Sequence, residues 1–246
     1  MTTARKKNGQ FSAVLLFFLV LLPATALAFW QGYSAGLTFS GLSVTMTVNL
    51  HAASMALWLI MLAVQAWFVN TGRMRWHRLL GKTSYVIAPA IVVLFFLTMF
   101  ELLGRTALPI EASTARIESF NWGAMTGFAV CWALAIVNRK RTSNHMRYMI
   151  STAFVVGNAI VTRILLSWFS WVPGFENLDV VIAVTGTIVA GPLILMIRAD
   201  HKSGHSPSPY WVPFGFLTFM YAGYYGFGYS DTWVSFVNWF AAFAHG

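Results

Sequence analysis

Seven long apolar runs decide what this chain can fold into. Each approaches the roughly 20 consecutive apolar residues that an α-helix needs to cross the hydrocarbon core of a bilayer. A segment inside lipid has to satisfy its backbone hydrogen bonds internally, so the sequence predicts an all-α, polytopic transmembrane helix bundle. The expected spans lie near residues 11–29, 43–69, 84–103, 120–138, 148–171, 179–197 and 210–229.

The composition supports a membrane protein and excludes other classes. Hydrophobic residues make up 58% of the 246 residues and charged residues only 9%, which is too little polar surface to cover a soluble globule. The net charge of +9 comes from basic residues between the spans, so we expect membrane lipids as partners and no nucleic acid. Cys131 is the only cysteine, which excludes an intrachain disulfide. We expect a single integral membrane domain over residues 1–246.

The same basic residues predict the orientation of the chain, because short cytoplasmic loops carry an excess of Lys and Arg. Thirteen cations fall on one side of the expected spans, and only Arg105 and Arg116 fall on the other. The N-terminus is therefore expected in the cytoplasm and the C-terminus outside, in a multi-pass protein of the bacterial inner membrane. The thirteen are Arg5, Lys6, Lys7, Arg73, Arg75, Arg78, Lys82, Arg139, Lys140, Arg141, Arg147, Arg198 and Lys202.

Three further patterns concern single segments. The first run has a basic start and ends in Ala26-Leu27-Ala28, which is also the pattern of a cleavable signal, but its apolar stretch is longer than a usual signal core and favours an uncleaved helix. Gly123 and Gly127 form a small-residue face for helix packing. Residues 232–244 alternate aromatic and apolar side chains, which predicts a short interfacial helix on the outer surface.

Arg163 is a lone cation inside an apolar run, and a guanidinium at membrane depth requires a partner or a function. At 1.5 Å per residue it lies about 12 Å below the outer end of its span, and His51 lies at about the same depth on another span. Glu101 and Asn121 stand near the outer ends of their spans, and Asn158 accompanies Arg163. We therefore expect these five residues to form an outward-facing ligand-binding pocket.

Two interpretations of this pocket remain open at the level of sequence. In the first, Arg163 holds an anionic group of a ligand, such as a lipid phosphate, a quinone oxygen or a haem propionate, beside a titratable His51. In the second, Arg163 pairs with Glu101 or with helix carbonyls, and the polar residues only fix helix packing.

Two histidines form a second candidate site on the expected cytoplasmic side. His77 and His145 each stand beside Arg residues at the start of an expected span. If the two helix starts adjoin, they are candidate ligands for a transition metal or for the iron of haem b, because neutral imidazole binds both. The alternative is that these basic residues only extend to lipid headgroups.

The order of these residues resembles that of a known family. In order and spacing the chain is similar to bacterial predicted membrane proteins classed as a domain of unknown function, over roughly residues 49–163. These carry an intramembrane His, an HR-x-x-G-(R/K) turn before a helix, an H-x-R-x-M stretch and an intramembrane Arg. Tyr85 stands one residue later than in many members. The matching positions are His51, Gln65, His77-Arg78-x-x-Gly81-Lys82-x-x-Tyr85, His145-x-Arg147-Tyr148-Met149 and Arg163.

The resemblance implies important positions but no reaction. The sequence has no Gly-rich nucleotide loop, no Gly-x-Ser-x-Gly elbow and no His-Glu-x-x-His motif. We therefore expect a protein without catalysis of its own, an accessory or assembly subunit of a membrane complex with polar rim sites for lipid or a cofactor. The alternative is a haem- or metal-binding redox protein that uses His77 and His145, with a quinone or anionic ligand near His51 and Arg163. A small transporter or sensor is less favoured because no inverted repeat is evident.

Overall fold

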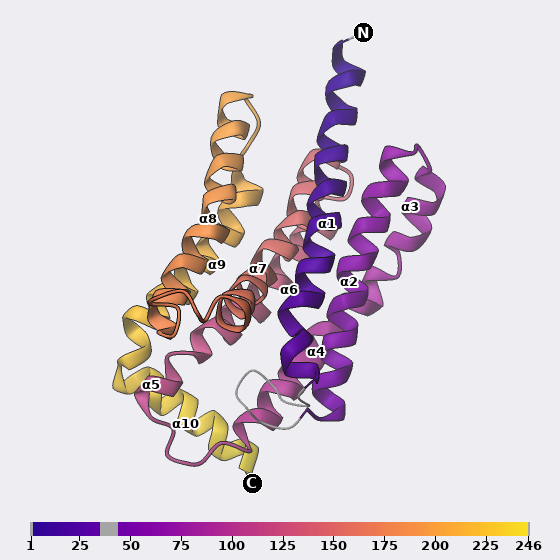
Figure 1. The fold of residues 1–246 in the computed structure, drawn as a ribbon. Coiled ribbons are helices and arrows are strands. Elements are labelled where there is room, and N and C mark those ends of the chain that lie inside the picture. The colour runs from indigo at the N-terminus through magenta and orange to yellow at the C-terminus, as the bar shows by residue number, and fades with distance from the viewer. Residues whose placement is uncertain (1, 35–43, 246) are drawn as a thin grey trace. The chain divides into compact units, whose positions relative to one another are not determined.

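A computed structural model describes residues 2–34 and 44–245, and these residues form helices and short connections without a β-strand. The predicted all-α fold is therefore confirmed (Figure 1). In chain order the elements are α1 (Thr2–Ser34), α2 (Met46–Asn70), α3 (Met74–Gly81), α4 (Ser84–Leu103), α5 (Ala112–Ala115), α6 (Glu118–Val137), α7 (Thr142–Trp168), α8 (Leu178–Lys202), α9 (Ser208–Tyr225), the 3-10 helix η1 (Phe227–Tyr229) and α10 (Asp231–His245).

Six segments within the described ranges are long and apolar enough to cross a membrane, which makes the chain a multi-pass membrane protein. They are α1, α2, α3 together with α4, α5 together with α6, α7, and α8. The seventh expected span also forms a helix, α9, but its Tyr residues and Pro-rich start make it less apolar than the other six. It nevertheless packs against α6, α7 and α8.

One helix boundary changes the expected depth of Arg163. Helix α7 ends at Trp168, three residues before the expected end at Trp171. Arg163 therefore lies five residues, or roughly 7.5 Å, from the end of its helix. That position is closer to the level of lipid headgroups than the sequence predicts.

The chain divides into two compact units, residues 1–94 and 95–246, with the boundary inside α4. In the first unit α1 packs against α2, and α3 folds back beside α2 (Figure 1). The turn between α2 and α3 contains Gly72 at φ +70°, a left-handed conformation that glycine adopts without a Cβ clash. Trp58 and Leu59 of α2 are fully buried.

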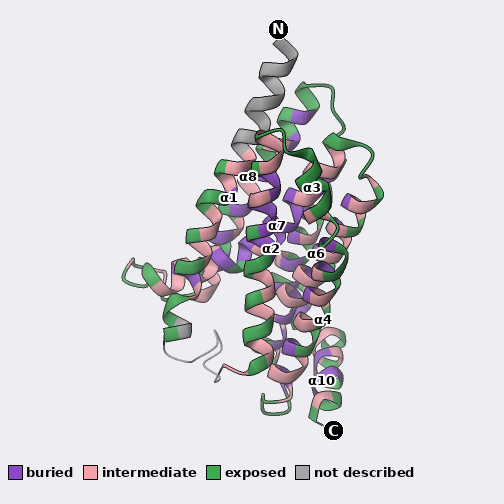
Figure 2. Ribbon diagram, turned by 90° about the vertical axis from the view of Figure 1, so that its right-hand side faces the viewer, coloured by how far each residue is buried: buried purple, intermediate pink, exposed green. Residues whose placement is uncertain are grey.

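The second unit is built on close contact between α6 and α9. Gly123 and Gly127 of α6 face Met220 and Phe216 of α9, and a Cβ on Gly127 would lie 3.0 Å from the Phe216 ring. The predicted small-residue face thus brings these two helices together. Buried residues run along most of α7, which contacts α6, α8 and α9 (Figure 2).

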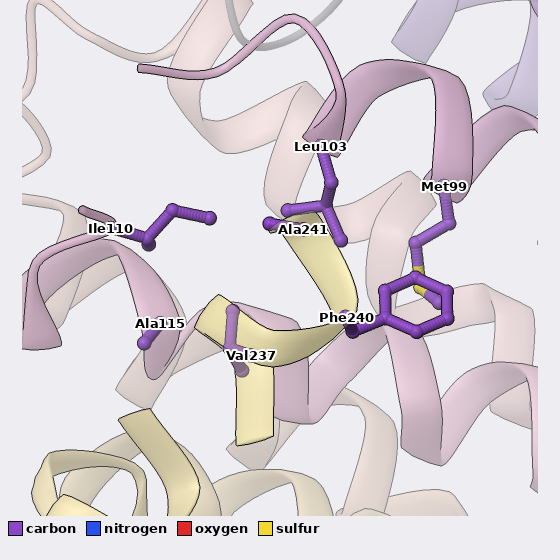
Figure 3. Close-up of a cluster of buried hydrophobic side chains, with 7 residues drawn as sticks. All are labelled: Met99, Leu103, Ile110, Ala115, Val237, Phe240 and Ala241. Carbon is purple, nitrogen blue, oxygen red and sulfur yellow. The ribbon is translucent and has the colours of Figure 1, made fainter. Parts of the chain in front are cut away.

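The C-terminal helix α10 confirms the short helix predicted after the last span. Asn238 fixes α10 to the loop between α4 and α5, because its Oδ1 accepts from the Ile110 N–H at 2.7 Å and its Nδ2 donates to the Ile110 carbonyl at 3.0 Å. Trp239 and Phe243 remain 65% and 71% exposed, as an interfacial helix requires. Figure 3 shows the apolar cluster that α10 forms with α4, α5 and the loop between them: Met99, Leu103, Ile110, Ala115, Val237, Phe240 and Ala241.

The packing of α9 on α6 can be tested at Gly223. A Cβ at this position would overlap the Ser119 side chain, whose hydroxyl donates to the Met220 carbonyl at 3.0 Å. We expect Gly223→Ala to lower the free energy of unfolding in detergent by about 1–3 kcal/mol, the usual cost of overpacking. Gly157→Ala is the matched control, because no described atom outside the adjacent residues and the backbone of its own helix lies within 4 Å of the position that the added methyl group would take. Equal stability of the two variants would show that α6 and α9 are not in close contact there.

Candidate functional site

The packing of α6 against α7 determines which polar residues meet at their predicted outer ends. His145 of α7 places its Nδ1 2.8 Å from the Ala135 carbonyl of α6. Further along, a Cβ on Gly127 would lie 3.2 Å from Val155. The two helices are thus antiparallel, and eight more residues along each bring Arg163 level with residues 118–119 of α6.

The helical period places Arg163 and Asn121 on particular sides of their helices. Arg163 follows His145 by eighteen residues, which is five helical turns, so both are on the face of α7 that looks toward α6. Asn121 precedes the buried Phe128 by seven residues and therefore shares its side of α6. Two of the residues predicted for the outer pocket therefore lie at the same end of one helix pair.

Glu118 adds a buried acid to this end of the pair. It is the first residue of α6 and is only 8% exposed. Its Oε2 accepts a 2.9 Å hydrogen bond from Nδ2 of Asn121. Among the described residues, no Lys, Arg or His lies within 4.0 Å of its carboxylate. A buried carboxylate is costly unless it is hydrogen-bonded or paired, so the Asn121 donor stabilises it here. Glu118, Asn121 and Arg163 are called the outer polar site below.

Arg163 itself is half-buried and donates from one Nη to the Ala159 carbonyl of its own helix at 3.2 Å. This bond to a helix carbonyl agrees with the interpretation in which Arg163 fixes helix packing. Glu101 lies 3.9 Å from Arg105 one turn later on the same chain segment, where both side chains are about one-third exposed.

Asn158 has a partner on a different helix. Its Oδ1 accepts a 2.7 Å hydrogen bond from the Tyr221 hydroxyl of α9, and Asn158 is only 5% exposed. The Tyr221 ring lies over Gly186 of α8, where a Cβ would be 2.7 Å from it. Asn158 thus joins α7 to α9 and points away from the face that carries Arg163.

His51 lies on α2, in the first unit, whereas Glu101, Asn121, Asn158 and Arg163 belong to the second. The pocket of all five residues stays a prediction.

Arg116, another cation on the predicted outer side, already has partners within the protein. It lies 3.0 Å from Asp179 and stacks 4.1 Å from the Tyr224 ring.

At the opposite end of α7, a buried ion pair joins α7 to α8. Arg147 donates from Nε and Nη2 to the two carboxylate oxygens of Asp200 at 2.6 and 2.5 Å, and their side chains are 4% and 10% exposed. Arg147 also contacts the Ser143 hydroxyl. The next turn of α7 reaches α9 through the Ser151 hydroxyl, which donates to the Pro209 carbonyl at 3.0 Å.

His145, next to this ion pair, is held in a defined orientation. A hydrogen bond from Nδ1–H to the Ala135 carbonyl leaves Nε2 with its lone pair, which is the tautomer that a metal-binding histidine needs. No group of three or more His, Cys, Asp or Glu side chains is arranged to hold a metal ion in the part of the chain that the structure describes.

His77, the other predicted metal ligand, lies on α3 in the first unit. With Leu80 and Gly81 it forms the less exposed side of α3, the side toward α2. There Gly81 meets the buried amide of Gln65, and a Cβ on Gly81 would lie 3.6 Å from its Nε2. Neither polar atom of the Gln65 amide has a hydrogen-bond partner among the described residues. The pairing of His77 with His145 remains a prediction.

These features define an all-α, multi-pass membrane protein with polar residues concentrated at both ends of α7. No protein family, curated protein or solved structure matches the chain.

The Arg147–Asp200 pair can be tested by removing one charge or both. Asp200→Asn leaves a buried guanidinium without its counter-ion, and we expect a loss of about 3–5 kcal/mol in the free energy of unfolding. The double variant Arg147→Met/Asp200→Leu removes both charges and should recover most of that loss. Chemical unfolding in detergent measures both variants. A double variant less stable than Asp200→Asn would contradict this account.

Proposed function

We propose that the chain is a non-catalytic integral membrane protein of the bacterial inner membrane, an accessory or assembly subunit whose outer polar site holds a lipid headgroup or the polar part of a cofactor. The observation that supports this proposal is that Arg163 lies at the same end of the α6–α7 pair as buried Glu118, which accepts a hydrogen bond from Asn121. The resemblance to bacterial membrane proteins of unknown function stays a prediction and adds no reaction.

The chemistry of the outer polar site suits a ligand that carries both an anion and a hydrogen-bond donor. Arg163 offers planar donors that match a phosphate or carboxylate. Glu118 and Asn121 offer acceptors for an ammonium or hydroxyl group. A phospholipid headgroup carries both kinds of group, and the depth of roughly 7.5 Å from the end of α7 is close to where headgroups lie.

Lipid retention tests this proposal. Native mass spectrometry of protein purified in mild detergent should show bound phospholipid, and Arg163→Gln should weaken its binding by about 10- to 100-fold, as expected for a charge-assisted hydrogen bond. Glu118→Gln should weaken binding of lipids with an ammonium headgroup more than of those without one. Exposed Arg105→Gln and Glu111→Gln are charge-matched controls on the same predicted side. Equal retention in site and control variants would contradict a ligand site.

A second function is favoured by the hydrogen bond of His145. With Nδ1 donating to Ala135, the free Nε2 suits a haem iron or a transition metal, and His77 is the candidate second ligand. When bound, such a group would supply electron transfer. This chain's residues would bind and orient it.

An absorption spectrum with metal analysis separates the two functions. The redox alternative predicts a Soret band or stoichiometric metal that His145→Ala abolishes, while His201→Ala, at an exposed position in the last turn of α8, keeps it. A preparation that retains phospholipid and has neither signal would exclude the redox alternative and leave the proposed accessory function standing.

A further inference from the structure

The charges of the first unit are all of one sign. Residues 1–94 contain seven Lys and Arg and no Asp or Glu, and the first acidic residue of the chain is Glu101. The second unit holds every acid of the protein. The cations of the first unit therefore have no acidic side chain of their own unit to pair with.

Four of these cations lie on and beside α3. Arg73, Arg75, Arg78 and Lys82 are all exposed, and none forms an ion pair within the residues that the structure describes. Arg73 stacks 4.7 Å from the Trp67 ring, which leaves its donors available. Four cations within ten residues, without a counter-ion, make a strongly positive surface.

The apolar residues of α3 are exposed as well. Trp76 and Leu79 are 55% and 56% exposed, and no residue of α3 is buried (Figure 2). The side toward α2 is taken by His77, Leu80 and Gly81, so the helix presents two other stripes. At 100° per residue, Arg75, Arg78 and Lys82 form one stripe, and Trp76 and Leu79 form the stripe beside it.

We propose that α3 and its flanking cations bind the anionic headgroups of phospholipids at the predicted cytoplasmic face. The Arg and Lys stripe contacts lipid phosphates, to which Arg offers a planar fork of donors. Trp76 and Leu79 enter the boundary between headgroups and acyl chains, where indole rings are favoured. Anionic lipid thereby supplies the counter-charge that the first unit lacks.

A lipid surface fits α3 better than an acidic protein does. Helix α3 begins the candidate span of residues 74–103, whose apolar part is α4, so we expect α3 at the membrane surface. An acidic protein would account for the cations but not for the exposed Trp76 and Leu79 beside them. Lipid binding by α3 is a separate proposal from the outer polar site, because the variants that test it change only α3 and the residues beside it.

Lipid competition in nanodiscs tests the proposal. Wild-type protein in mixed phosphatidylcholine and phosphatidylglycerol should retain phosphatidylglycerol preferentially when analysed by native mass spectrometry. Each cation at an anionic surface contributes about fivefold in affinity, so Arg75→Gln/Arg78→Gln/Lys82→Gln should lower this preference at least tenfold. The charge-keeping variant Arg75→Lys/Arg78→Lys should retain most of it. The matched control is Arg139→Gln/Lys140→Gln/Arg141→Gln, which removes three exposed cations from another loop on the same predicted side.

A second readout does not depend on how the triple variant folds. In a Cys131→Ser background, a spin label at Leu79→Cys should move deeper into the bilayer when phosphatidylglycerol is added to phosphatidylcholine. Equal loss of preference in the two triple variants, or an unchanged label depth, would overturn the proposal. Wild-type protein without phosphatidylglycerol preference that instead binds an acidic protein through α3 would overturn it in favour of a protein partner.

Discussion

The structure depends on the constraint that a polar group inside lipid must find its partner within the protein. Isolated hydroxyls meet this constraint within their own helix, as Thr152 does by donating to the Met149 carbonyl at 2.7 Å. Larger polar groups need another helix. Tyr221 reaches Asn158 across α7 and α9, and Arg147 reaches Asp200 across α7 and α8. These bonds select particular neighbours among helices whose apolar surfaces alone would pack in many ways, because lipid is as apolar as the side chains themselves.

The apolar part of the fold could be predicted from the sequence. The span expected at 84–103 coincides with α4, the small-residue face at Gly123 and Gly127 contacts α9, and a helix follows the last span. Each of these depends on a local pattern of hydrophobicity or residue size. Which ends of the spans face the cytoplasm stays a prediction. It rests on the distribution of Lys and Arg, which depends on how a chain enters a membrane and not on how its helices pack.

The polar partners could be predicted only in part, for physical reasons that differ from residue to residue. Asp200 is separated from Arg147 by 53 residues, and the apolar pattern places it in a cytoplasmic loop because that pattern ends at 197, whereas α8 continues to Lys202. The same pattern places Glu118 outside the membrane, because the apolar run begins at 120. The helix in fact starts at Glu118, so Asn121 comes one turn later on the same side. A Glu three residues before an Asn is a weak signal until the helix start is known.

The predicted outer side and the predicted cytoplasmic side of the protein also differ in charge. An acid and an arginine share the predicted outer end of α6 and α7, whereas α3 presents cations without acids. A single chain therefore offers one site suited to an individual polar ligand and one surface suited to many anionic lipids.

The central claim is that Glu118, Asn121 and Arg163 enclose a ligand at the predicted outer end of α6 and α7. Its most direct test is an experimental structure of the protein in native lipid, determined by electron microscopy with a bound antibody fragment. The account predicts ordered density that is not protein, within hydrogen-bond distance of the Arg163 guanidinium and the Glu118 carboxylate. A Glu118 carboxylate enclosed by protein side chains alone, with no such density beside Arg163, would contradict it.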